Sequence, residues 1–156
     1  MRILILEDDA CRRRLFQMIL ESDGFEFTIC ADPIDFILEL AFSASHIGLI
    51  SLDHDLSEIK RSCGMMSQDC GCAIVEFMKH MKPICPVIIH SQNELARENM
   101  AEALKQSYWN VLTICDSPDV EGSLINNSWI ELIRTASGNL KISDESAEPL
   151  PIADGV

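Results

Sequence analysis

Short apolar runs alternate with amphipathic segments along most of the chain. Five runs rich in Ile, Leu and Val predict buried strands near residues 2–6, 25–30, 47–53, 86–90 and 109–115. Apolar residues at helical spacing predict helices near residues 10–22, 32–43, 70–81, 93–106 and 124–136. Gly24 ends the first helix, and Asp32-Pro33 begins the second. This repeated β-α order predicts an α/β fold, with a doubly wound five-stranded parallel sheet covered by helices on both faces.

The chain of 156 residues suits one folded domain, which we place at residues 1–137. Residues 138–156 are rich in Ser, Asp, Glu, Pro and Gly, and this composition predicts a flexible acidic tail. No run approaches the roughly 18 apolar residues that a membrane span needs. The apolar run at the N-terminus is too short for a signal peptide. We therefore expect a cytoplasmic protein with no membrane partner.

The chain is strongly acidic, with 12 Lys and Arg against 25 Asp and Glu and a net charge of −13. This charge argues against binding to a nucleic-acid duplex, whose phosphates would be repelled. It suits a protein that binds divalent cations. Acidity also keeps a protein soluble, and the overall charge does not choose between these two explanations.

The seven cysteines do not predict a disulfide framework, because their number is odd and the chain has no secretory features. Three lie at or beside apolar runs and are predicted to be small buried side chains: Cys30, Cys85 and Cys115. Three others share one predicted loop region, Cys63, Cys70 and Cys72, but lack the paired spacing typical of a zinc site. A structural metal there is an open alternative.

Acidic residues and histidines cluster where the predicted strands end. Ligands bind at the carboxyl ends of strands in folds of this class, which singles out Glu7, Asp8, Asp9, Asp53, His54, Asp55, His90, Ser91 and Asp116. Carboxylates gathered there would repel one another unless a cation or protons offset their charge. Oxygen ligands favour Mg²⁺, and we predict a magnesium site held by Glu7, Asp8, Asp53 and Asp55. The alternative is helix capping, but caps alone do not explain acids after both the first and the third strand.

His54 and His90 follow the third and fourth strands, where an imidazole could act as general acid or base on a phosphate ester. The alternative for each is a structural histidine in the core. Strand alternation would point His54 away from Asp53 unless the strand breaks at that position. Ser91 and Asn93 could orient phosphate oxygens, although Asn93 could also cap the following helix.

The remaining histidines and the tryptophans have simpler interpretations. His46 precedes a predicted strand and His80 lies late in a predicted helix, so we assign neither a function. Trp109 and Trp129 are predicted to anchor the core.

The strand-end residues resemble those of response-regulator receiver domains. The resemblance rests on the runs Ile3-Leu4-Ile5-Leu6-Glu7-Asp8-Asp9 and Pro86-Val87-Ile88-Ile89-His90-Ser91, with Asp53 between them. It implies strand order 2-1-3-4-5, an acidic pair at Glu7 and Asp8, a phospho-acceptor at Asp53 and a switch residue at Ser91. The chain departs from the family after the fifth strand, where Thr113-Ile114-Cys115-Asp116-Ser117-Pro118 lacks the usual Lys. That departure weakens the expectation of ordinary phosphorelay signalling.

The chain more closely resembles a divergent branch, the cyclic-phosphate processing receiver domains. The shared segments span residues 1–136: Leu-Glu-Asp followed by Arg12, Ser51-Leu52-Asp53-His54-Asp55-Leu56, Asp69-Cys70-Gly71, Cys85-Pro86-Val87-Ile88-Ile89-His90-Ser91-Gln92-Asn93, Asn99-Met100 and Trp129. The resemblance implies processing of cyclic nucleotides or cyclic phosphate ends.

Two functional hypotheses follow. In the first, the protein is a metal-assisted phosphoesterase in which Asp53 helps to hold the cation, His54 and His90 transfer protons, and Arg12, Ser91 and Asn93 bind the phosphate. Its partner would be a small molecule or chain end that carries a cyclic phosphate. In the second, the protein is a stand-alone receiver that acts as a phosphorylation or docking switch for a signalling partner.

Overall fold

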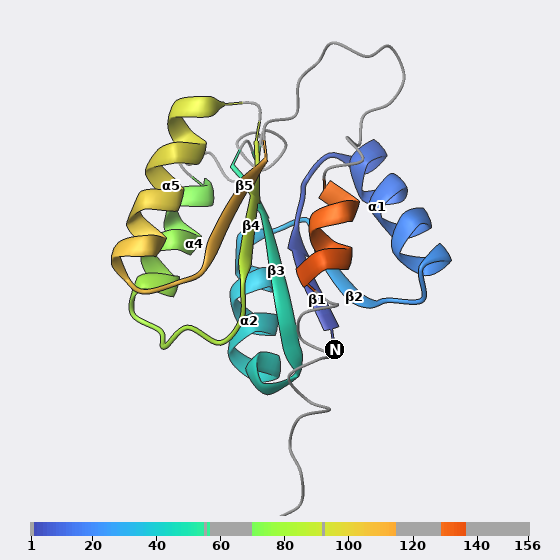
Figure 1. The fold of residues 1–156 in the computed structure, drawn as a ribbon, viewed down its shortest axis with the longest axis horizontal. Helices are drawn as coiled ribbons and strands as arrows, with labels where there is room; N and C mark the ends of the chain where they lie inside the picture. The colour runs from blue at the N-terminus through green and yellow to red at the C-terminus, as the bar shows by residue number, and fades with distance from the viewer. Residues whose placement is uncertain (1, 55, 57–69, 92, 115–128, 137–156) are drawn as a thin grey trace, which may run out of the picture.

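The computed structural model describes residues 2–54, 56, 70–91, 93–114 and 129–136, and it shows a three-layer α/β arrangement (Figure 1). Five parallel strands form one sheet in the order β2-β1-β3-β4-β5. The strands are β1 (Arg2–Leu6), β2 (Glu26–Cys30), β3 (Ile47–Asp53), β4 (Val87–His90) and β5 (Val111–Ile114). The predicted fold class and strand order are confirmed.

Helices cover both faces of the sheet (Figure 1). On one face lie α2 (Pro33–Ser43), α4 (Cys70–Lys79) and α5 (Glu94–Gln106), and a 3-10 turn, η1 (Ala44–His46), follows α2. On the other face lie α1 (Ala10–Ser22) and a helical segment at residues 129–136. The predicted start of this last helix, at residues 124–128, lies outside the described residues, as do the predicted tail and the loop that carries Cys63.

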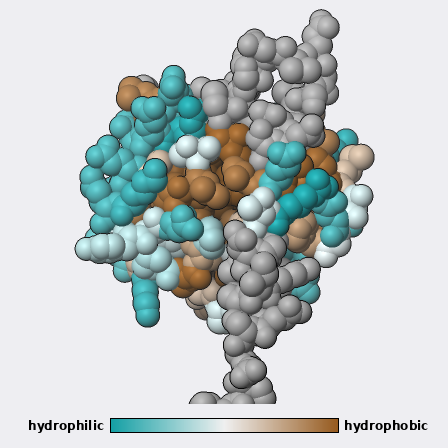
Figure 2. Space-filling view, viewed as in Figure 1, coloured by the Kyte–Doolittle hydropathy of each residue, from teal (hydrophilic) through white to brown (hydrophobic). Residues whose placement is uncertain are grey.

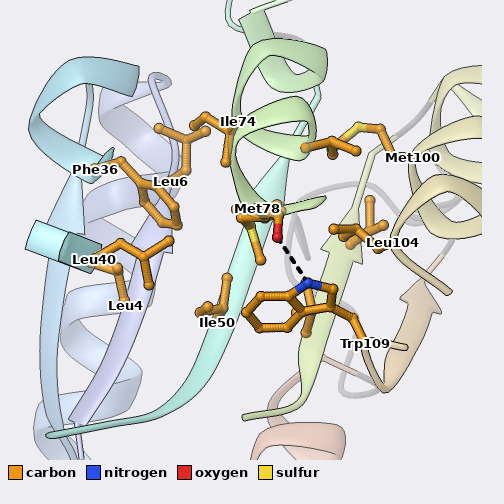
Figure 3. Packing of buried hydrophobic residues seen from close by; sticks show 14 of the residues in the cluster. Leu4, Leu6, Phe36, Leu40, Ile50, Ile74, Met78, Met100, Leu104 and Trp109 are labelled. Atoms are coloured by element: carbon orange, nitrogen blue, oxygen red, sulfur yellow. Dashed lines mark hydrogen bonds between the residues drawn. The ribbon is translucent and has the colours of Figure 1, made fainter. Parts of the chain in front are cut away.

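Alternation along the strands explains the two apolar cores, because successive side chains of a strand point to opposite faces. Leu4 and Leu6 belong to the core under α2, α4 and α5, whereas Ile3 and Ile5 belong to the core under α1 and residues 129–136. Figure 3 shows the first core, in which the Trp109 indole donates a hydrogen bond of 3.1 Å to the carbonyl of Met78. The prediction that both tryptophans anchor the core is confirmed, since Trp109 and Trp129 are 3% and 2% exposed.

The helix boundaries follow from local chemistry. Side chains of Asp9, Asp32 and Asn93 accept backbone hydrogen bonds at the N-termini of α1, α2 and α5. Gly24 has a φ of 72° just after α1, where the left-handed conformation suits glycine. Tyr108 adopts a φ of 66° at the equivalent place after α5, which the sequence did not indicate.

The molecular surface is unevenly polar. In the view of Figure 2, hydrophilic side chains cover α5, whereas hydrophobic residues lie at the centre, where Figure 1 places the β5 edge of the sheet.

The register of the central strands positions the candidate site. Asp53 pairs with His90, and Leu6 pairs with Leu52, so that Glu7 follows directly beside Asp53. The carboxyl ends of β1, β3 and β4 therefore place their terminal polar residues together.

Candidate functional site

Glu7, Asp53 and His90 meet at the carboxyl ends of the three central strands. One side-chain ligand atom from each lies within 4.8 Å of the others. Along their strands they share the side of Ile5, Leu49 and Ile88, which is the face under α1 and residues 129–136. Their exposed fractions are 0%, 2% and 2%. The site is thus a buried group of two carboxylates and one imidazole.

Arg12 reaches this group from the first turn of α1. Its Nε donates to Glu7 Oε2 at 2.8 Å, and one terminal nitrogen donates to both Glu7 Oε1 at 2.8 Å and Asp53 Oδ2 at 2.5 Å. The helix start fixes this position, because Asp9 Oδ1 accepts from the Arg12 backbone N–H at 2.7 Å. The backbone N–H of Asp9 in turn donates to Glu7 Oε1 at 2.8 Å. Asp9 is therefore a helix cap, whereas Glu7 belongs to the buried group.

The electrostatics favour the charged forms of this ion pair. Burial alone would raise the pKa of Glu7, but the nearby His90 ring and the Arg12 guanidinium outweigh it and lower the pKa below its ordinary value. Burial opposes the charged guanidinium of Arg12, yet Glu7 and Asp53 raise its pKa above its ordinary value. Glu7 is thus ionised at neutral pH and paired with a permanent cation.

Contacts on several sides fix the His90 ring. Ser51 Oγ lies 2.9 Å from His90 Nδ1, and the Trp129 indole N–H donates to the same Ser51 oxygen at 3.0 Å. The Phe16 and His90 rings form an edge-to-face contact with their centroids 5.4 Å apart. Phe16 also stacks on Trp129, with 4.1 Å between the ring centroids. His90 Nε2 lies 3.4 Å from Glu7 Oε2. The alignment of that contact is not that of a hydrogen bond, and within the described part of the chain the buried Nε2 has no hydrogen-bond partner.

Sequence reasoning missed the role of Ser51 and the link from Trp129 to the site. Ser51 had a detectable signal, because a lone hydroxyl in an apolar strand lies two residues before Asp53 and so shares its face. Trp129 was predicted as a core anchor and is among the residues that carry the family resemblance, but neither observation indicated a contact with the site.

Ser91 and Asn93 lie at the turn from β4 into α5. Ser91 is 3% exposed, and its Oγ accepts from the Asn93 backbone N–H at 3.1 Å. Its carbonyl accepts from the buried Arg97 side chain at 2.7 Å. Asn93 Oδ1 accepts from the Ala96 N–H at 3.1 Å, so Asn93 has the capping role that was weighed as its alternative. Phosphate binding by either residue stays a prediction.

The other predicted site residues are placed less closely. Asp8 is 2% exposed, and its backbone carbonyl accepts from Arg13. His54 is 6% exposed but is not among the residues that share the 4.8 Å group, which matches the alternation that separates it from Asp53. Asp55 lies outside the described residues. The roles assigned to Asp8, His54 and Asp55 therefore stay predictions.

The donor set fits a divalent cation in part. Two carboxylates and an imidazole match the ligands of Mn²⁺, Fe²⁺ or Zn²⁺, whereas Mg²⁺ prefers oxygen alone. The orphaned Nε2 of His90 is the atom that a cation could satisfy. Arg12 already contacts both carboxylates, so an ion that binds all three residues would compete with its guanidinium.

Solved structures share this fold. A response regulator receiver domain from Methanospirillum hungatei is 19% identical, with a TM-score of 0.63 over 90% of this chain and 96% of that one. A receiver domain from Clostridium thermocellum gives 19% identity, a TM-score of 0.62 and coverage of 90% and 97%. The response regulator TrrA from Thermotoga maritima, in complex with Mg²⁺-BeF, is 17% identical, with a TM-score of 0.57 over 86% of this chain and 97% of that one. No curated protein matches the chain.

A family model decides the assignment. The model of the cyclic-phosphate processing receiver domain matches residues 2–106, which is more than half of the chain. The chain belongs to this family. In this cyclic-phosphate processing receiver domain, the matched segment contains Glu7, Arg12, Asp53 and His90 but ends before Trp129. Among its described helices, none combines the length and apolar content that a bilayer crossing requires.

Proposed function

We propose that the protein is a phosphoesterase that opens cyclic phosphates, with cyclic nucleotides or cyclic phosphate ends as the substrate class. One observation carries the proposal: Arg12 bridges the buried carboxylates of Glu7 and Asp53 beside His90, at the strand ends where ligands of α/β folds bind. The group combines a permanent cation, acids that can hold a metal, and an imidazole. Membership of a family described as processing cyclic phosphates supports this choice of substrate.

The proposed roles follow the chemistry of ester hydrolysis. Water attacks phosphorus, the bond to one ester oxygen breaks, and that oxygen takes up a proton. His54 and His90 are the predicted proton-transfer groups, and Arg12, Ser91 and Asn93 are predicted to bind phosphate oxygens. A divalent cation held by Asp53 with Glu7, Asp8 or Asp55 would neutralise charge that develops on the phosphate. Mg²⁺ is the predicted ion.

The activity is tested by incubating the purified protein with 3′,5′-cyclic and 2′,3′-cyclic mononucleotides, with Mg²⁺ or Mn²⁺, and separating the products by chromatography. We expect ring opening of at least one substrate. Asp53→Asn should lower kcat by roughly 100-fold or more, and His54→Ala and His90→Ala by roughly 100-fold each, the range typical of proton transfer.

His46→Ala and His80→Ala are the matched controls, because both side chains are exposed and lie outside the site. They should keep the full rate. If no cyclic phosphate is opened with any of these ions, or if His54→Ala and His90→Ala both keep the full rate, the proposal is wrong.

A second candidate function is a phosphorylation switch. Asp53 ends β3 of a receiver fold, and the similar TrrA structure contains Mg²⁺-BeF. Beryllofluoride with Mg²⁺ should then perturb the amide NMR signals around Asp53 and Ser91, and Asp53→Asn should abolish the change. An unchanged spectrum would exclude this switch. The cytoplasmic location and a signalling partner stay predictions under either function.

A further inference from the structure

We infer that Glu7, Asp53 and His90 form a cation site with a nitrogen ligand, selective for Mn²⁺ or Zn²⁺ over Mg²⁺, and that Arg12 is the internal cation which such an ion displaces. This inference rests on the cation-assisted chemistry proposed above and specifies its metal. It differs from the predicted magnesium site, which used oxygen ligands alone.

The His90 ring has an unsatisfied nitrogen. Its Nε2 is buried, has no hydrogen-bond partner among the described residues and lies 3.4 Å from Glu7 Oε2. A buried polar atom without a partner costs free energy, and a bound ion is one of the features that explain such an atom in a native fold. One ligand atom from each of Glu7, Asp53 and His90 lies within 4.8 Å of the others. A cation between these three atoms would satisfy the nitrogen and offset the acids together.

Neighbouring side chains hold the His90 ring from behind. A histidine that binds a metal through Nε2 carries its proton on Nδ1 and donates it to a neighbouring acceptor. Ser51 Oγ lies 2.9 Å from Nδ1 and can accept that proton while it also accepts from Trp129. Phe16 contacts both His90 and Trp129 and so restricts rotation of the His90 ring. The imidazole is thus held in one orientation before any ion binds.

Two carboxylates, Glu7 and Asp53, share the single guanidinium of Arg12. A divalent ion carries twice the charge of that guanidinium and would interact more strongly with this pair. The Arg12 side chain is 23% exposed, whereas those of Glu7 and Asp53 are 0% and 2% exposed. Arg12 is therefore the member of the group with a path to solvent, and once displaced its guanidinium is available to an anionic ligand.

Ion selectivity follows from the nitrogen. Mg²⁺ strongly prefers oxygen ligands in an octahedral arrangement, whereas Mn²⁺ accepts both oxygen and imidazole and Zn²⁺ favours imidazole. If His90 binds the ion, its Nε2 cannot transfer a proton, and His54 is the remaining histidine of the predicted pair for that role.

The test uses the full-length protein without substrate, so that binding is measured independently of turnover. Isothermal titration calorimetry gives the Kd for Mn²⁺, Zn²⁺ and Mg²⁺, and pulsed EPR of bound Mn²⁺ detects coupling to a ligand nitrogen. We expect Mn²⁺ to bind at least about tenfold more tightly than Mg²⁺. The nitrogen coupling should persist in His54→Ala and disappear in His90→Ala.

Variants around the site test each argument. His90→Ala should weaken Mn²⁺ binding by roughly 100-fold, and Ser51→Ala by roughly 10–100-fold. Arg12→Met should tighten it by roughly tenfold or more, since the competing charge is gone. His80→Ala, an exposed control, should bind like the wild type. Circular dichroism identifies any variant that fails to fold, and the wild-type EPR spectrum tests the nitrogen ligand without a variant.

Three results would overturn the inference. Bound Mn²⁺ without nitrogen coupling, together with loss of binding in Asp8→Asn but not in His90→Ala, would place the ion among the oxygen ligands. Weaker rather than tighter binding in Arg12→Met would exclude displacement. No binding of any divalent ion would refute the cation site. If the same sample still opened cyclic phosphates, the proposed function would hold, with Arg12 as the cation of the site.

Discussion

Arg12 contacts two buried carboxylates, and its removal takes away the cation that lies between them. We predict that Arg12→Met, which keeps much of the side-chain length, lowers the free energy of unfolding by about 3 kcal/mol, as for other broken buried ion pairs. Urea denaturation at neutral pH in the presence of EDTA measures the change. Adding Glu7→Gln to this variant should restore part of the loss, because the buried charge is then removed as well.

Arg14 provides the control for this prediction. It lies on the same helix but is exposed, so Arg14→Met should change the stability by less than about 0.5 kcal/mol. Equal effects of the two substitutions would show that loss of helix charge, and not of the buried pair, explains the result.

The thiols of this chain should differ in reactivity with pH. Burial, with Asp35 as a second cause, raises the pKa of Cys30 to about 11, and burial raises that of Cys85 to about 12. The thiolate is the reactive form, so both should resist iodoacetamide at pH 8 and react only as the pH approaches those values. Cys11 is exposed and should be modified before Cys30 and Cys85. Peptide mass spectrometry over a pH series checks this order, and early labelling of Cys30 would contradict it.

Sequence could locate most of the site but not its contacts. The rule that ligands bind at strand ends selected Glu7, Asp53 and His90, and the structure brings their ligand atoms together. Arg12 can pair with both carboxylates because the first turn of α1 directs its long side chain toward them. The hydrophobic periodicity of the sequence does not predict that direction. The family resemblance indicated Arg12 as a candidate, and the structure shows the three hydrogen bonds from its side chain to the carboxylates of Glu7 and Asp53.

Two helices of this fold end in the same hydrogen-bond pattern but with different residues. After α1, the N–H groups of Gly24 and Phe25 donate to the carbonyls of Glu21 and Leu20. After α5, Tyr108 and Trp109 donate in the same way to Lys105 and Leu104. This is the Schellman motif, whose left-handed position normally carries glycine. Tyr108 adopts that conformation with a φ of 66° while its side chain is 90% exposed.

We therefore predict that Tyr108→Gly stabilises the protein by about 1 kcal/mol, because the strain of a left-handed L-residue is relieved and no buried contact is lost. Gly24→Ala is the reciprocal test and should cost about 1 kcal/mol. Its φ is 72° and no atom lies within 4 Å of the added methyl group, so any loss comes from the backbone. Thermal unfolding by circular dichroism compares both variants, and a destabilised Tyr108→Gly would contradict the explanation.

The sequence predicted helices and strands well where the hydrophobic pattern was strong, but it predicted their bounds less accurately near the Schellman turns. The apolar strands β1 and β3 have the bounds that their sequence patterns predicted. The fifth strand was predicted to begin at Trp109, but β5 begins at Val111. Trp109 completes the Schellman turn and fills the core beside Met78, so its apolar character reflects packing and not strand structure (Figure 3).

At the scale of the whole molecule, the segment at residues 129–136 connects the fold to the site. Trp129, Ile130 and Ile133 belong to the core on the α1 face, and Trp129 also donates to Ser51 beneath His90. An ion pair of 2.8 Å between Arg134 and Asp23 joins this segment to the end of α1, but Arg134 is exposed and such pairs contribute little. Apolar burial is therefore what holds the segment in place.

Two truncations should separate the domain from the predicted tail. A chain of residues 1–137 keeps every described residue and should unfold with nearly the stability of the full chain. A chain of residues 1–128 loses Trp129, Ile130 and Ile133, which are 2%, 6% and 0% exposed. Each such side chain contributes about 1.5–3 kcal/mol, so their combined loss approaches the total stability of about 5–15 kcal/mol.

We expect the shorter chain to bind a hydrophobic dye and to lose cooperative unfolding, although it contains the whole segment that matches the family model. Urea titrations followed by far-ultraviolet circular dichroism compare the two truncations with the full chain. Trp129→Phe in the full chain keeps an aromatic ring beside Phe16 while it removes the hydrogen bond to Ser51 and part of the buried volume, so it perturbs the core less than the truncation does. A cooperative 1–128 chain would show that the last helix is dispensable for the core, and the link from Trp129 to His90 would then concern the site alone.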